Sequence, residues 1–429
     1  MKKFSFLLLL ILIVQQISLC QSGREDIYSE FVLYNKRERL NKDLRENIVA
    51  RAFSQKLDSN NEHKFESACK AISQFMIMSD DVKDGFEQLF DQYDVIPYPT
   101  KRAFLEAVYG VYPTGYENEM QLILQKEKDP KLFAMSALYA YRADTSAENV
   151  NKIKIRMIEQ FPGYDSINIL SELENYLHYH YGLTKRKTPD IRQLFAYQQT
   201  HGKKIIYSFQ RWNRDYPGLA IVQDADGRFM RNQSGRLMVF QQLARSASDL
   251  PYFLTNGSTP QGIYSIQGTA VARNNYIGPT PNFQLLMPHE KDWSKFFHQP
   301  VDSTQDSLQL YKQLLPPSWR NYSPMNEAWH AGKIGRTEII AHGTTIDPEY
   351  FKDKPYYPLT PTMGCLCAKE VWNITSGKLL VSEQFNLIST FTATPGQKGF
   401  LYVINIDDQQ KVVMREDIEK WVNAFEKRK

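Results

Sequence analysis

The sequence predicts a protein of mixed α and β structure, with an all-helical domain over residues 21–197 and a mostly β domain over residues 198–429 that carries a few helices. Apolar residues recur three and four positions apart up to about Tyr197, whereas short runs rich in β-branched and aromatic residues follow residue 200. A polar segment with a proline, TKRKTP at 184–189, separates the two patterns. The length of 429 residues allows two or three domains with full-sized cores.

The first 20 residues have the pattern of a secretory signal peptide. Lys2 and Lys3 precede a short apolar run, and the small residues Ser18 and Cys20 follow it. Cleavage after Cys20 would leave a periplasmic or extracellular protein, and a lipid anchor on Cys20 is the alternative that a bulky Leu19 disfavours. The later sequence predicts no transmembrane segment, because no other stretch is apolar enough.

The charge balance points to no polyanionic partner. Removal of Lys2 and Lys3 would lower the formal net charge from +4 to +2. We therefore expect no binding of nucleic acid.

The helical prediction rests on segments such as residues 65–78 and 131–142, with breaks at proline and glycine clusters between helices. Residues 102–112 and 131–141 are similar to each other at a spacing of thirty, which is compatible with helix-pair repeats. Cys69 lies on the apolar stripe of its predicted helix, where a buried and inert thiol is expected.

The β prediction rests on several apolar runs and on turn signals such as DADG at 224–227. The expected strands are residues 204–213, 217–223, 229–231, 236–243, 260–266, 337–342 and 399–407. Residues 283–335 are predicted to form an irregular or helical insertion beside a site. Residues 415–426 are predicted to form a helix that closes the chain.

The chain without its first 20 residues would keep three cysteines, Cys69, Cys365 and Cys367. An odd number argues against a disulfide framework, and residues two apart seldom reach disulfide geometry. A structural zinc site would need more nitrogen and sulfur ligands, and His178 and His180 would point to different faces of a helix. We expect no metal and no other cofactor.

Cys365 and His342 are the candidate reactive pair. His342 ends a predicted strand 23 residues before Cys365, which directly follows Gly364. A cysteine nucleophile needs a neighbouring base or cation to hold it as a thiolate. A glycine before it allows a tight turn, so that backbone N–H groups can face a developing oxyanion.

This pattern resembles the L,D-transpeptidases with a YkuD-type catalytic domain, in which an upstream histidine precedes a Ser/Thr-His-Gly-Cys box. The hairpin around residues 224–227, the segment 244–266 with its TPQGIYSI ending, and the strand at 399–406 are similar to further parts of that domain, in the same order. The resemblance covers about residues 200–407. It does not extend to the helical region.

The resemblance implies a β-sandwich-like catalytic domain with Cys365 as nucleophile and His342 as general base. It implies that the backbone carbonyl of Gly343 orients the imidazole and that the backbone amides of residues 363–365 form the oxyanion hole. The residues of the box before the nucleophile are Thr362, Met363 and Gly364.

The sequence departs from the family pattern at several positions. Met363 replaces the usual histidine of the box, and Cys367 and Ala368 stand where an arginine and a polar residue are usual. A branch with the box Ser-x-Gly-Cys-x-x-Ala would be closer. The interval from His342 to Cys365 is also long, with a tyrosine-rich loop at 347–358.

Four residues are candidates for a substrate groove, with ordinary packing as the alternative: Thr344, Trp319, Trp329 and Tyr356. Cys367 is expected to pack with its side chain directed away from the site, and a sulfur contact that limits overoxidation is the alternative. His330 is expected at the surface without a partner.

The resemblance implies an exported cysteine acyltransferase that acts on peptidoglycan stem peptides through a thioester on Cys365. Transfer to an amine would cross-link stems, and transfer to water would trim them. The helical domain would dock a protein partner or position the wall. The alternative is a peptidoglycan-binding or scaffold protein with a decayed box, as Met363 and the missing arginine suggest. A Cys-His amidase is disfavoured, because its cysteine normally precedes its histidine.

Overall fold

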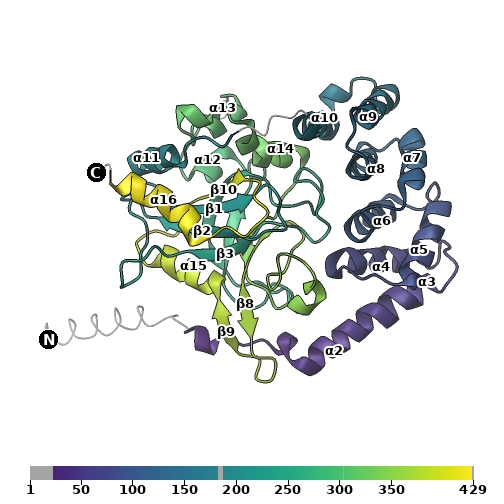
Figure 1. Ribbon diagram of the computed structural model, residues 1–429, viewed down its shortest axis with the longest axis horizontal. Helices are drawn as coiled ribbons and strands as arrows, with labels where there is room; N and C mark the ends of the chain where they lie inside the picture. Colours follow the sequence, from purple (N-terminus) through teal and green to yellow (C-terminus); the bar gives the residue numbers. More distant parts are fainter. Residues whose placement is uncertain (1–22, 182–186, 303, 428–429) are drawn as a thin grey trace, which may run out of the picture.

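The computed structural model describes residues 23–181, 187–302 and 304–427. The predicted signal peptide, with Cys20, and residues 184–186 of the predicted linker lie outside these residues. The chain is of mixed α and β structure, and a stack of helices is followed by a region built around a β-sheet (Figure 1).

The helical region begins with short helices and continues as a run of longer ones. Asp129 shows how one of them starts, because its carboxylate accepts hydrogen bonds from the N–H groups of Lys131 and Leu132 and Pro130 is the first helical residue. The elements are η1 (Arg24–Asp26), η2 (Glu30–Val32), α2 (Tyr34–Lys42), the π-helical η3 (Asp43–Ala50), α3 (Arg51–Phe53), α4 (Glu62–Phe75), α5 (Asp80–Asp91), α6 (Tyr98–Val111), α7 (Glu117–Lys126), α8 (Pro130–Ala143), α9 (Ala147–Gln160), η4 (Tyr164–Ser166) and α10 (Asn168–Tyr181).

The longer helices form two rows. Helices α4, α6, α8 and α10 lie in the row that faces the sheet, and α5, α7 and α9 lie outside it (Figure 1). The similar segments at residues 102–112 and 131–141 fall on α6 and α8, which pack directly against each other. Cys69 is fully buried in this stack, as expected.

The β region forms a closed barrel with the strand order β1-β10-β4-β5-β6-β7-β3-β2. Its strands are β1 (Ile205–Arg211), β2 (Gly218–Gln223), β3 (Phe240–Leu243), β4 (Gly262–Ala270), β5 (Asn282–Leu286), β6 (Ala341–His342), β7 (Leu366–Ala368) and β10 (Gly399–Asp407). The pairs β1–β10 and β6–β7 are parallel, and the other pairs are antiparallel.

The expected sandwich-like arrangement is therefore wrong. The very short strands β6 and β7 pair with each other and link β5 to β3, which closes the sheet on itself. The apolar side chains of the barrel interior include Ala341 and Leu366 from these two strands. A separate hairpin, β8 (Glu370–Trp372) and β9 (Leu379–Ser382), follows the closure.

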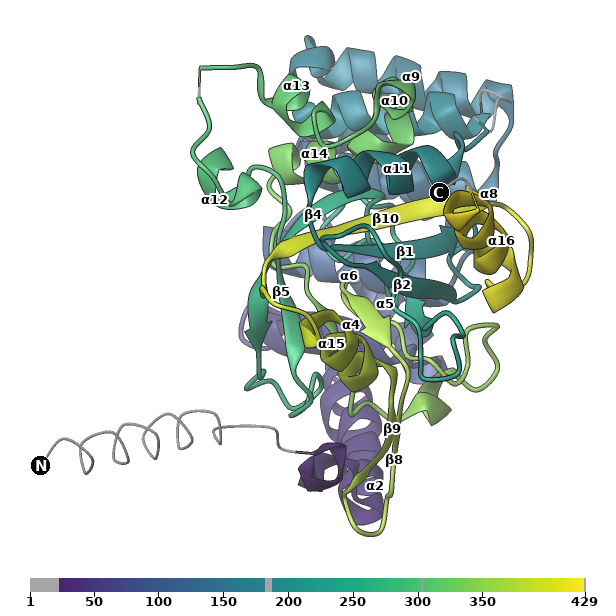
Figure 2. The same cartoon turned by 90° about the vertical axis from the view of Figure 1, so that its left-hand side faces the viewer.

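Helices cover the outside of the barrel. Helices α11 (Ile191–His201) and α16 (Arg415–Glu426) pack together on the outer face of β1 and β2, so α11 belongs with the barrel although its sequence continues the helical pattern (Figure 2). Between β5 and β6 lie α12 (Trp293–Phe297), α13 (Ser307–Lys312), η5 (Pro317–Trp319), η6 (Ser323–Asn326) and α14 (Glu327–Ile334). Two further elements are η7 (Pro348–Phe351) and α15 (Glu383–Thr392). The expected insertion at 283–335 thus overlaps β5.

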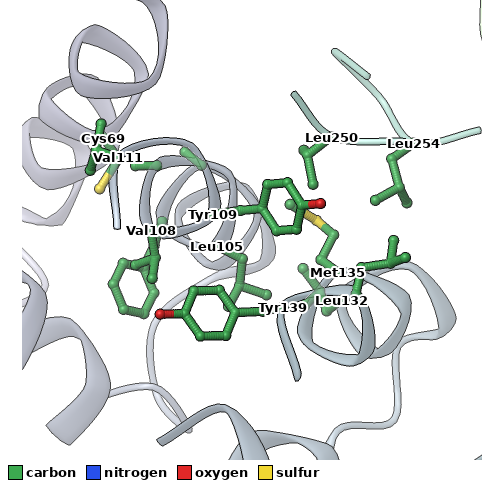
Figure 3. Close-up of a cluster of buried hydrophobic side chains, with 14 of the residues drawn as sticks. Cys69, Leu105, Val108, Tyr109, Val111, Leu132, Met135, Tyr139, Leu250 and Leu254 are labelled. Atoms are coloured by element: carbon green, nitrogen blue, oxygen red, sulfur yellow. The ribbon is translucent and has the colours of Figure 1, made fainter. Parts of the chain in front are cut away.

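The apolar core of the helical region extends into loops of the barrel region, which also has separate cores of its own. The loop over residues 244–261, between β3 and β4, places Leu250 and Leu254 against α6 and α8, where Tyr109 and Met135 meet them (Figure 3). Polar contacts reinforce this packing, because Asn256 donates to both carboxylate oxygens of Glu106 at 3.0 and 2.9 Å. The helical stack thereby holds the 244–261 loop.

Membrane-spanning helices are not found in the part of the chain that the structure describes, since none of its helices has the length and the apolar run that a bilayer requires.

Candidate functional site

The parallel pair of β6 and β7 carries the candidate site on its outer face. The register pairs Ala341 with Leu366 and His342 with Cys367. Because side chains alternate along a strand and Ala341 and Leu366 point into the barrel, His342 and Cys367 lie on the opposite face. Cys365 directly precedes β7, and its thiol lies against the backbone of Glu338 and Ile340, just before β6.

His342 is oriented by its own backbone neighbour. The side chain is buried, and its Nδ1 is hydrogen-bonded to the backbone carbonyl of Gly343. A carbonyl only accepts hydrogen bonds, so Nδ1 carries the proton and Nε2 keeps its lone pair. Burial lowers the pKa of His342 to about 4, and the imidazole is therefore neutral around pH 7.

Cys365 is half-buried at the start of β7. Its Sγ lies 3.5 Å from the backbone N of Ile340, which donates to it, and 3.7 Å from the carbonyl oxygen of Glu338. Burial raises the pKa of the Cys365 thiol, while the Ile340 N–H and the charge of Arg336 act in the opposite direction.

The structure places Cys365, directly before β7, two register positions from His342 on the neighbouring strand β6, since His342 pairs with Cys367. Among the hydrogen bonds of the described residues, none joins the thiol to the imidazole. Two register positions correspond to about 6–7 Å along the strands, so direct proton transfer would require the thiol and the imidazole to approach each other when substrate binds.

The box before Cys365 forms a tight turn. The Thr362 hydroxyl accepts a hydrogen bond from the Gly364 N–H at 3.1 Å and donates to the Cys365 carbonyl at 2.8 Å. Gly364 has a φ of 114°, and a side chain there would overlap the Arg336 guanidinium and approach the Gly257 carbonyl to 2.8 Å. Only glycine fits this position.

The Gly364 N–H is therefore engaged within the box. Of the amides expected to form the oxyanion hole, those of Met363 and Cys365 are not used by any backbone or side-chain hydrogen bond given for the described residues. Met363 itself is half-buried and supplies no ring nitrogen to the site. The turn can thus offer two backbone donors.

Arg336 is a site residue that the sequence analysis missed. Its guanidinium donates to three backbone carbonyls of the 244–261 loop, those of Tyr252, Gly257 and Ser258. It lies against Gly364, and the described residues include no carboxylate in an ion pair with it. Burial lowers the pKa of Arg336 to about 10, and its positive charge favours the thiolate of Cys365.

Glu370 is a second missed residue. Its buried carboxylate accepts from the Thr344 N–H at 2.8 Å and from the Ser382 hydroxyl at 2.6 Å. It also packs against Gly343 so closely that a side chain at that position would overlap it. Burial raises the pKa of Glu370 to about 7. Glu370 therefore fixes the backbone whose carbonyl holds His342.

The signal for these two residues was weak in the sequence. Arg336 precedes a short strand in an ordinary polar stretch, and Glu370 follows the box among alternating residues. Neither position has a motif of its own. The closure of the barrel and the 244–261 loop bring them to the site.

Cys367 is fully buried, as a packing residue should be. Its thiol lies 3.6 Å from the Thr360 hydroxyl, and burial raises its pKa to about 12. The expectation that its side chain turns away from the site was wrong, because the register places it beside His342. Strand alternation puts residues two apart on the same face.

The four candidates for a substrate groove are packed inside the protein. Trp319 and Tyr356 are fully buried, and Thr344 and Trp329 are buried. The indole N–H of Trp319 donates to the Asp190 carbonyl, and Tyr356 lies beneath Arg245. The alternative of ordinary packing describes these four residues.

His330 does have a partner, contrary to expectation. Its Nδ1 lies 3.4 Å from a carboxylate oxygen of Glu172 on α10.

The described residues include no group of three or more His, Cys, Asp or Glu side chains that could hold a metal ion. In the comparisons with known proteins, no family model, no curated protein and no solved structure matches this chain.

Proposed function

We propose that the protein is a cysteine acyltransferase of the L,D-transpeptidase kind, which acts on peptidoglycan stem peptides in the periplasm or outside the cell. The observation that supports this most is the pairing of β6 with β7, which brings Cys365, directly before β7, within two register positions of a neutral His342. The tight turn at Gly364 and the cation of Arg336 add to it.

The proposed reaction begins when Nε2 of His342 takes the proton of the Cys365 thiol. The thiolate attacks the carbonyl carbon of the third stem residue, and the oxyanion accepts hydrogen bonds from the backbone N–H groups of Met363 and Cys365. The C–N bond then breaks, and the imidazolium returns its proton to the departing amine of the terminal D-amino acid. An amine or water attacks the thioester after His342 removes its proton, and the Cys365 thiol is released.

In this proposal Arg336 takes the place of the arginine that the family box carries two positions after the cysteine. Cys367 stands at that position here and is uncharged while its pKa is near 12. Arg336 reaches the same turn from the segment before β6 and lies against Gly364. It is a positioning residue, because it acts on the thiol through its charge and on the turn through its packing.

A second candidate function is a peptidoglycan-binding or scaffold protein without catalysis. The raised pKa of Cys365 and the missing thiol–imidazole hydrogen bond among the described contacts favour it. Such a protein would use the same outer face for binding only.

The experiment that separates the two functions is incubation of purified muropeptides with the protein, followed by mass spectrometry. The proposal predicts cross-linked or trimmed stems with the parent and unchanged stems with Cys365→Ala. A carbapenem-type acylating probe should add its mass to the parent and not to Cys365→Ala.

Cys367→Ala is the matched control, since it removes a thiol two residues away and should keep both activities. Unchanged muropeptides together with an unlabelled, folded parent would overturn the catalytic proposal. Retention on peptidoglycan by both parent and Cys365→Ala would then support the binding function.

A further inference from the structure

A cavity of about 380 Å³ lies between the helical region and the barrel region. Tyr109 from α6 and Leu250 from the 244–261 loop both line it and lie close together in Figure 3. The cavity is distinct from the β6–β7 seam, and charged side chains from both regions reach it. Those charged groups are Arg142, Arg214, Asp249 and Glu327.

The two arginines have unused donors. Arg142 stacks over the Tyr109 ring at 3.6 Å from its centroid, and its Nε and Nη2 have no hydrogen-bond partner among the described residues. Arg214 donates to the Thr259 carbonyl at 3.2 Å, and its Nη1 has no such partner. Neither guanidinium forms an ion pair with a carboxylate in the described part of the chain. Both guanidinium groups therefore border the cavity without a carboxylate in contact, and their donors without a partner are buried.

The hydrogen-bond acceptors that line the cavity belong to other residues than the two arginines. Glu327, at the start of α14, accepts from the backbone N–H and the side-chain amide of Gln261 at 2.8 and 3.0 Å. Asp249 accepts a hydrogen bond from the Ser258 hydroxyl at 3.2 Å, and its side chain is 45% exposed. Asn405 also lines the cavity, and its buried Oδ1 has no partner among the described residues.

The charges act on one another across the cavity without touching. The carboxylates of Glu327 and Asp249 both favour the charged form of Arg214, and Arg142 favours that of Asp249. Asp249 pairs instead with Arg245, whose Nη2 lies 3.8 Å from its carboxylate, whereas Arg142, Arg214 and Glu327 form no ion pair among the described residues. Burial raises the pKa of Glu327 to about 7 and lowers that of Arg214 to about 10, so both charges lack part of their solvation.

We infer that this cavity binds the zwitterionic head of an α-amino acid, with the carboxylate against Arg142 and Arg214 and the ammonium group against Glu327, the carboxylate of the wall that has no cation in contact. Buried charges are stable only when they are paired and hydrogen-bonded. A ligand with one charge would satisfy one wall and leave the other unpaired. A ligand with both charges on neighbouring atoms bridges the gap, and the cavity has room for such a head and a side chain.

The cavity borders the candidate site through one residue. Thr259 lines the cavity, and its hydroxyl donates to the Gly364 carbonyl at 2.9 Å, directly before Cys365. The inference does not depend on the proposed function, because it concerns binding by residues outside the reactive pair.

The test is isothermal titration calorimetry of the full exported chain with D-alanine and L-alanine, and with acetate and methylammonium as single-charge controls. Saturable binding of at least one alanine enantiomer, with no saturable heat from either control, is expected. No saturable binding of either enantiomer would overturn the inference and leave a cavity that holds water only. Equal binding of alanine and acetate would also overturn it, since one charge would then suffice.

Two variants probe the two walls. Arg214→Met should weaken alanine binding by about tenfold to a hundredfold, the loss expected for a hydrogen bond to a charged group. Glu327→Gln keeps the shape of the side chain and should weaken binding similarly, which keeps the test decisive if Arg214→Met fails to fold. Parent-like affinity in a folded variant of either kind would contradict the assignment of that wall. Lys152→Gln, at an exposed pair on α9, is the control.

The zwitterion could come from a free amino acid or from the end of a peptide side chain. S-methylglutathione presents an α-amino-acid head on a γ-linked peptide and serves as the second probe. Binding of alanine alone indicates a free amino acid, and competitive binding of both indicates that a peptide-borne head enters. Either result supports the inference.

Discussion

The helical stack and the β6–β7 seam are held together in opposite ways. The stack is built on apolar contacts such as those of Phe104, whose ring centroid lies 4.7 Å from that of Phe90 and 5.4 Å from that of Phe86. The seam holds a buried imidazole, a buried guanidinium and a buried carboxylate, those of His342, Arg336 and Glu370. His342 and Arg336 are hydrogen-bonded to backbone carbonyls, and Glu370 accepts from a backbone N–H and from the Ser382 hydroxyl.

This difference indicates that the helical stack mainly determines the stability of the fold and that the β6–β7 seam determines the chemistry of the site. A buried apolar side chain contributes more to the free energy of unfolding, and a cavity in its place lowers that free energy. A buried polar network specifies one arrangement, and it destabilises the fold when one of its hydrogen bonds is missing. The stack reaches the seam through the 244–261 loop, whose carbonyls hold Arg336. The helices therefore stabilise the site from a distance, and variants in each region should separate the two roles.

The largest effect is expected in the stack. Phe104→Ala should lower the free energy of unfolding by about 4 kcal/mol, because a fully buried ring is replaced by a cavity. Urea unfolding measures this, and the alkylation rate of Cys365 in the folded protein should stay unchanged. Leu122→Ala, on an exposed position of α7, is the control. A loss below about 1 kcal/mol for Phe104→Ala would contradict the role given to the stack.

The next effect concerns the pH dependence of stability at the seam. The pKa of Glu370 is about 7 when folded against 4.5 ordinarily, so the folded state holds the proton more tightly. The free energy of unfolding should therefore fall as pH rises from about 4.5 to about 7, by about 3 kcal/mol in total from this group.

Glu370→Gln should remove that fall, and the difference between the parent and variant pH profiles isolates it. His342 acts in the opposite direction, since its lowered pKa makes stability fall as pH drops from 6.5 towards about 4. His342 is present in both the parent and Glu370→Gln, so its contribution cancels when one pH profile is subtracted from the other. Parallel profiles for parent and variant would show that Glu370 does not titrate in this range.

A smaller effect is expected on the reactivity of the thiol. Arg336→Met should raise the pKa of Cys365 and slow its alkylation at pH 8 by about tenfold, because the neighbouring cation is lost. Arg336→Lys should recover part of the rate, since it restores the charge without the planar fork. Arg228→Met removes an exposed arginine and is the control. An unchanged pH profile of alkylation in folded Arg336→Met would reduce Arg336 to a packing role.

The smallest effect is expected at the contact between the two regions. The Lys131 ammonium donates to the Thr255 hydroxyl at 3.2 Å. Thr255→Val keeps the shape and removes this bond, so the free energy of unfolding should fall by about 0.5–1 kcal/mol. Thermal unfolding measures the change, and a loss above about 3 kcal/mol would show that this contact carries more of the interface than the shared apolar core does.

The sequence determined the order of the regions and several elements within them. Apolar periodicity predicted the helices of the stack, and the closing helix at 415–426 has the expected bounds. The long strands β1, β2 and β10 follow from runs of apolar residues that bury one face or both. Cys365, Gly364 and His342 could be chosen as candidates because a cysteine after a glycine and an upstream histidine are chemically specific in sequence.

Only the tertiary structure decided how the barrel closes and what surrounds the thiol. Strands β6 and β7 have two and three residues, too few to show a period, so their pairing comes from long-range contacts. That pairing sets Cys367 beside His342, and the 244–261 loop and the hairpin after β7 bring Arg336 and Glu370 to the seam. The physical reason is that local patterns record which face of an element is buried, whereas the partners of a buried charge are chosen by segments far apart in the chain.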